Sequence, residues 1–191
     1  MNTHPLHVAI LELLNKSINC GKDIKIYPDS SCLKKKNKNK MHVSLFLGNL
    51  KKRTYHFCDV DLLITHNDKI KIIIEIEESG RQPVKIFGKV FTSAMATHFI
   101  HHKIAPDGIT KHDKVLFIQV IDSSKLKENG YRKKQWEEIR KLLENIVNNK
   151  SLKDITQYEM FIGKGSEFKS DSKSELGNKL TACVKKFLNI K

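Results

Sequence analysis

Four stretches of the chain carry apolar residues at intervals of three and four, the spacing that predicts an amphipathic helix. Gly21 follows the first stretch as a stop signal, and Pro83 begins the second at a position where helices tolerate proline. The second helix is expected to extend to His98, with His101 and His102 continuing one of its faces; no further metal ligand accompanies them. The predicted helices cover residues 6–18, 83–98, 135–147 and 176–188.

Alternating patterns and short apolar runs predict five strands. The run KVLFIQVI at 114–121 is apolar almost throughout, which is typical of a strand buried on both faces. The other predicted strands cover residues 42–48, 55–65, 70–77 and 158–163. A mixed central sheet flanked by helices follows, so the predicted fold class is α/β (α+β), in a single domain over residues 1–191.

Four carboxylates stand on two neighbouring strands of this prediction. Asp59 and Asp61 lie two residues apart on the first strand, and Glu75 and Glu77 on the second. Alternate residues of a strand share a face and lie roughly 7 Å apart. The opposite face is apolar and consists of Val60, Leu62, Ile64, Ile72, Ile74 and Ile76. One face is therefore suited to a core, and the other concentrates negative charge.

The pairing register decides whether the acids of the two strands meet. A loop of residues 67–69 places Asp61 opposite Glu75, and the same count places Asp59 opposite Glu77. A four-residue loop would turn the acids to opposite faces, because neighbouring side chains alternate. Only the first register gives both strands a common apolar face, so it is predicted, with room for a local bulge.

Opposed carboxylates destabilise a sheet, and a divalent cation would remove their repulsion. Mg²⁺ prefers hard oxygen ligands from one or two carboxylates, so the acidic face predicts a magnesium site. The alternative is that the acids form only the solvated face of an edge hairpin. Two observations would contradict the metal site and require any function that depends on it to be abandoned: Asp61 and Glu75 on opposite sides of the sheet, or a lysine ammonium filling the space between them.

The charge balance favours a polyanionic partner, since 35 Lys and Arg against 21 Asp and Glu give a formal net charge of +14. Basic residues gather at 34–40 and at 51–53. No apolar run is long enough to span a membrane, and the first residues lack the features of a signal peptide. Four scattered cysteines without CxxC spacing argue against a disulfide framework and fit a reducing cytoplasm.

Two segments resemble the motif of the PD-(D/E)xK nuclease superfamily. VDLLI at 60–64 is similar to its PDLLI element, with Asp61 as the aspartate. IIIEIE at 72–77 is similar to its second element, with Glu75 as the acidic residue. Glu77 stands where lysine is usual, a variant that some restriction endonucleases carry. The resemblance implies a restriction-endonuclease-like fold and a metal-dependent endodeoxyribonuclease of the restriction-enzyme type.

The resemblance also implies roles for individual residues. Mg²⁺, with Mn²⁺ as a substitute, would be held by Asp61, Glu75 and the backbone carbonyl of Ile76. Asp59 and Glu12 are further candidate ligands. Glu77 would orient or deprotonate the attacking water. The positive charge of the missing lysine would come from Arg81, Lys85 or Lys89.

Double-stranded DNA is the expected partner, with backbone phosphates held by Lys34, Lys35, Lys36, Lys51, Lys52 and Arg53. No helix-turn-helix or zinc-finger pattern that would read bases is present. The chain therefore looks most like a catalytic subunit that relies on a larger DNA-recognising subunit, such as the small subunit of a heterodimeric type IIS nicking enzyme. The alternatives are a junction resolvase or repair nuclease of the same superfamily, and a non-catalytic nucleic-acid-binding module.

Overall fold

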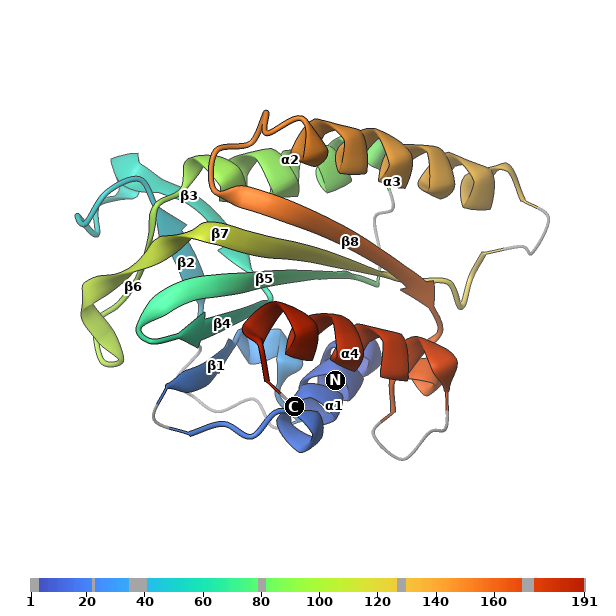
Figure 1. Cartoon of the computed structure of the whole chain (residues 1–191), viewed down its shortest axis with the longest axis horizontal. Helices are drawn as coiled ribbons and strands as arrows, with labels where there is room; N and C mark the ends of the chain where they lie inside the picture. Colours follow the sequence, from blue (N-terminus) through green and yellow to red (C-terminus); the bar gives the residue numbers. More distant parts are fainter. Residues whose placement is uncertain are drawn as a thin grey trace.

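The computed structural model describes residues 4–21, 23–34, 41–78, 82–126, 130–169 and 174–190, and it has three layers (Figure 1). One mixed eight-stranded sheet lies between two pairs of helices, which confirms the predicted α/β class. Helices α1 and α4 cover one face, and α2 and α3 cover the other. The helices are α1 (Pro5–Ser17), α2 (Pro83–Met95), α3 (Tyr131–Asn148) and α4 (Glu175–Leu188), with short 3₁₀ turns η1 (Ser30–Cys32), η2 (Arg53–Tyr55) and η3 (Gly165–Phe168). None of the described helices is both long enough and apolar enough to cross a membrane.

The sheet runs in the order β1-β4-β5-β7-β6-β2-β3, and β8 pairs with β7. Strands β5, β7 and β8 are parallel, and all other pairs are antiparallel. The long strand β7 joins two parts of the sheet, because its beginning pairs with β6 and its end with β5 and β8. The strands are β1 (Ile24–Pro28), β2 (Val43–Phe46), β3 (His56–Val60), β4 (Leu62–His66), β5 (Lys69–Glu77), β6 (His98–His101), β7 (Ala105–Asp122) and β8 (Ile155–Gly163).

Strand β5 is apolar on both faces because both faces are covered. Ile72, Ile74 and Ile76 pack in the core on the α1 and α4 side, as the alternation predicted. Ile73 packs on the other side, beneath α2 and α3. Glu75 shares this second face by its position in the strand, so the acidic face is not a solvated one. The solvated-hairpin alternative is therefore wrong for Glu75, whose exposed fraction is 1%.

The β4–β5 turn differs from the prediction, but the register beyond it does not. Asn67 and Asp68 have φ of 51° and 52°, so a two-residue turn replaces the predicted three-residue loop. A bulge after Ile64 then restores the pairing of Leu62 with Ile74. Continuing that count places Asp61 opposite Glu75, the predicted arrangement.

The second part of the register prediction is wrong. Strand β3 pairs with β2, where Asp59 lies opposite Ser44, and so Asp59 does not face Glu77. The predicted 55–65 strand is interrupted at Asp61, where the chain passes from one part of the sheet to the other. The second helix is also shorter than predicted: it ends at Met95, and His98–His101 form β6, so the expected histidine helix face does not exist.

Candidate functional site

Three carboxylates and one ammonium group meet at the carboxyl end of β5. Lys89 Nζ lies 2.7 Å from Glu75 Oε2, 2.7 Å from Glu77 Oε1 and 4.0 Å from Asp61 Oδ2. Asp61 comes from the connection between β3 and β4, and Lys89 lies on the flank of the apolar stripe by which α2 packs on the sheet. Of the three cations predicted to replace the lysine missing at position 77, Lys89 is the one that the structure places beside Glu75 and Glu77.

This arrangement meets one of the two conditions that would contradict a metal site. Asp61 and Glu75 reach the same space, so the first condition is not met. The ammonium of Lys89 fills that space, so the second condition is met. The prediction that four carboxylates together surround an ion is therefore wrong, because Asp59 lies elsewhere. An ion could bind to the other three only if Lys89 moved. The Lys89 side chain is 30% exposed, and its four-carbon stem leaves room for that movement.

Glu75 is the most deeply buried member of the cluster. One carboxylate oxygen, Oε2, accepts a hydrogen bond from Lys89 at 2.7 Å. The other, Oε1, is buried without a hydrogen-bond partner. Burial and the neighbouring Asp61 charge raise the pKa of Glu75 well above its usual value, although Lys89 opposes the shift. A buried carboxylate oxygen without a donor is destabilising, so this oxygen is suited to accept a proton or a cation.

Asp61 is held from three sides. Its Oδ2 accepts a hydrogen bond from the Ile76 N–H at 2.7 Å, and its Oδ1 lies 3.3 Å from His7 Nε2. Burial alone would raise its pKa, but His7, Lys89 and the Ile76 N–H together lower it. Ile76 was predicted to offer its carbonyl to a metal; the contact that the structure shows is its N–H. Asp61 is therefore an ionised and oriented carboxylate beside a protonation-prone one.

Sequence analysis did not single out the histidine pair at the start of α1, His4 and His7. His7 Nδ1 and His4 Nδ1 each lie 3.2 Å from a different oxygen of Glu78, the first residue after β5. Glu78 also accepts the Leu6 N–H at 2.6 Å and the His7 N–H at 3.2 Å, so it caps the start of α1. Burial lowers the pKa of His7, but Asp61 and Glu78 outweigh it and raise that pKa above the usual value.

His4, His7 and Glu78 form a second donor set, with one ligand atom from each within 4.8 Å of the others. Nitrogen ligands suit Zn²⁺ and other transition metals, whereas Mg²⁺ favours the oxygens of Asp61 and Glu75. In the structure Glu78 already caps the start of α1, and His7 lies beside Asp61 through its other ring nitrogen, Nε2. An i, i+3 histidine pair at a helix start was the sequence signal that could have indicated it.

Several predicted site residues lie away from the cluster. Glu12, five residues beyond His7 on α1, is exposed and pairs with Lys34. Lys85 is exposed one turn before Lys89 on α2. Lys35, Lys36 and Arg81 lie outside the described residues.

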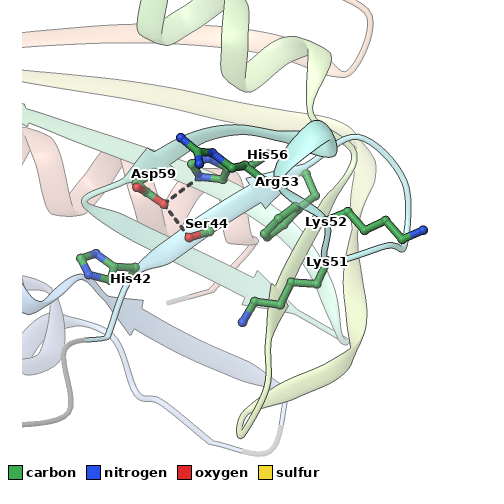
Figure 2. A pocket seen from close by; sticks show the side chains of 8 residues that line it. His42, Ser44, Lys51, Lys52, Arg53, His56 and Asp59 are labelled. Atoms are coloured by element: carbon green, nitrogen blue, oxygen red, sulfur yellow. Dashed lines mark hydrogen bonds and ion pairs between the residues drawn. The ribbon is translucent and has the colours of Figure 1, made fainter.

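Asp59 belongs to a basic pocket on the outward face of β2 and β3. Figure 2 shows its carboxylate pointing toward His56 and Ser44, with Oδ1 at 3.1 Å from His56 Nε2 and at 2.5 Å from Ser44 Oγ. The pocket has a volume of about 360 Å³. Its lining residues are His42, Ser44, Phe46, Lys51, Lys52, Arg53, His56 and Asp59.

Comparison of the whole chain with models of protein families, with curated proteins and with solved structures found no match. The resemblance to the PD-(D/E)xK motif consequently stays a prediction that depends on the residues themselves.

Proposed function

We propose that the chain is a metal-dependent endonuclease that hydrolyses phosphodiester bonds of DNA, with its active site at the carboxyl end of β5. The observation that carries the proposal is the meeting of Asp61, Glu75 and Glu77 around Lys89, with one buried oxygen of Glu75 left without a partner. Acidic residues and a lysine around one point are the chemical groups that the motif resemblance implies.

The donor set fits a small divalent cation better than it fits the ammonium alone. Three carboxylates face one lysine, so the cluster keeps an excess of negative charge even when Lys89 is present. Asp61 and Glu75 would hold Mg²⁺, the two carboxylates that such an ion commonly takes. Bound there, the ion would neutralise phosphate charge and lower the pKa of a water molecule. Lys89 would have to leave Glu75 for this to happen.

The chain's own residues would then divide the remaining work. Lys89, displaced from Glu75, stays within reach of Glu77 and adds positive charge beside the scissile phosphate. Glu77 orients the attacking water and accepts its proton. The water oxygen forms a new bond to phosphorus, the ester bond between phosphorus and the leaving oxygen breaks, and that oxygen takes a proton from solvent water. His7 holds Asp61 in place, as an outer partner of a metal ligand does.

The presence of Lys89 between the carboxylates favours a second candidate function. If the ammonium never leaves, the cluster is a fixed ion-pair network and the chain is a non-catalytic nucleic-acid-binding module. The same residues then stabilise the fold and give no hydrolysis. The net charge of +14 fits both functions, so it does not choose between them.

Cleavage of supercoiled plasmid tests the proposal. Wild-type protein, Glu75→Gln and the exposed-helix control Glu137→Gln are incubated with Mg²⁺ or Mn²⁺, and with EDTA. Nicking or linearisation by the wild type and the control, but not by Glu75→Gln, is the expected result. Equal cleavage by Glu75→Gln would show that the active site is elsewhere. Branched and mismatched duplexes are tested as well, because they are the substrates of resolvases and repair nucleases. DNA binding without cleavage of any of these substrates would favour the non-catalytic module.

A further inference from the structure

The floor of the basic pocket is the outward face of the β2–β3 ladder. Ser44 pairs with Asp59, and Phe46 with His56, while Val43 and Leu45 on the alternate positions are buried in the core. The floor is therefore fixed by backbone pairing and by the packing beneath it. Figure 2 shows the side chains of His42, Ser44, His56 and Asp59 along this floor.

The basic wall of the pocket is a loop that the structure ties down. The Leu47 N–H donates to the Tyr55 carbonyl at 2.8 Å, and the Tyr55 N–H donates to the Lys52 carbonyl at 2.9 Å. Gly48 has a φ of +84°, which favours glycine, and its N–H donates to Thr97 Oγ1 at 2.7 Å. These bonds hold residues 51–53 at the rim without using their charged groups.

The acidic group of the pocket has partners, whereas its basic groups have no carboxylate beside them among the described residues. The one carboxylate, Asp59, already has Ser44 and His56 as partners. Lys51, Lys52 and Arg53 are exposed, and no carboxylate among the described residues lies within ion-pair distance of them. Three cations at the rim of the pocket suit oxyanions, and an arginine beside lysines is well adapted to phosphate.

We propose that this pocket holds the sugar–phosphate backbone of duplex DNA and that it contributes affinity without reading bases. Contacts with backbone phosphates position a duplex on the protein and carry no sequence information. The pocket adjoins the carboxylates through the chain itself, since Asp59 precedes Asp61 by two residues. Its role of holding DNA for cleavage rests on the proposed function, but its affinity for DNA does not.

Salt-dependent DNA binding tests the pocket separately from catalysis. Binding of a fluorescent duplex is measured by anisotropy in EDTA over a range of salt concentrations, for wild type and for the triple variant Lys51→Gln, Lys52→Gln, Arg53→Gln. Each phosphate that a protein neutralises contributes about 0.9 to the slope of log K against log salt. The slope is therefore expected to fall by about 2 to 3 in the variant.

A matched control removes the same three charges elsewhere: Arg132→Gln, Lys134→Gln, Lys153→Gln, all exposed. It is expected to keep a slope within about one of wild type. Equal slopes for the pocket variant and wild type would overturn the proposal. A variant whose slope falls with duplex RNA but not with duplex DNA would also overturn it. If the slope falls but no plasmid is ever cut, the nuclease proposal fails and the pocket stands. Circular dichroism of both variants checks that they are folded.

Discussion

Replacing Lys89 by methionine separates a metal site from a fixed ion-pair network. Methionine keeps much of the length and apolar stem of lysine but removes the charge. In EDTA the three carboxylates around it lose their shared cation, two of them at 2.7 Å. Removing one partner of a buried ion pair is destabilising by about 3–5 kcal/mol, and the partial exposure of Lys89 puts the expected loss of unfolding free energy at about 3 kcal/mol.

Magnesium should reverse this loss if the carboxylates bind it. A ligand at 100 times its dissociation constant stabilises the folded state by about 2.7 kcal/mol. Because no ammonium competes in Lys89→Met, the variant is expected to bind Mg²⁺ more tightly than wild type and to gain more stability from it. At the same time it should cut DNA more slowly, since it lacks the cation beside the phosphate.

The assay is urea denaturation with and without Mg²⁺, combined with calorimetric titration of the metal. Lys85→Met is the control, because Lys85 is exposed on the same helix one turn earlier. If Mg²⁺ leaves the unfolding free energy of both wild type and Lys89→Met unchanged, no ion binds at this cluster. The excess of carboxylates would then not create a metal site, and Lys89 would be a structural partner of these carboxylates.

Four further substitutions each change a single side chain. Glu75→Gln should be more stable than wild type by about 1–3 kcal/mol at pH 8; since folding raises the Glu75 pKa, the contribution of Glu75 to wild-type stability falls as pH rises above 4.5, and the difference between the two proteins should disappear in urea denaturation near pH 4. Asp61→Asn should lower plasmid cleavage by roughly 100-fold or more, whereas Asp59→Asn should keep cleavage and raise DNA affinity, because Asp59 lies in the basic pocket. Tyr158→Phe should lower the unfolding free energy by about 1–3 kcal/mol, since it leaves buried Gln119 Oε1 without the donor it has at 2.6 Å.

The alternation of the two central strands was enough to predict the core of the site. A period of two puts Asp61 and Glu75 on one face and the isoleucines on the other, and the apolar match selects the correct register despite the unexpected turn. Lys89 was among the predicted cations, but its partners depend on how α2 packs on the sheet. That packing is a long-range property which local spacing does not encode.

The errors have equally particular causes. Asp59 does not face Glu77 because the eleven residues that the alternation predicts as one strand change partners at Asp61. His7 and Glu78 are about seventy residues apart in sequence and meet only because α1 begins beside the end of β5. The spacing predicts helix at the histidine strand β6 because its histidines continue the helical spacing of α2.

The one-residue connection between β3 and β4 fixes the distance along the chain between the basic pocket and the carboxylate cluster. Asp59 in the pocket and Asp61 in the cluster are separated by two residues of nearly extended chain, about 7 Å. Along one strand of duplex DNA this is about two steps of 3.4 Å. That interval is set by the pairing of β3 with β2 and of β4 with β1 and β5. If the chain is the proposed nuclease, a duplex seated in the pocket would be cut at a constant offset from its point of attachment, whatever its sequence. An inserted residue at this connection would shift the offset and also turn the Asp61 carboxylate to the other face of the sheet.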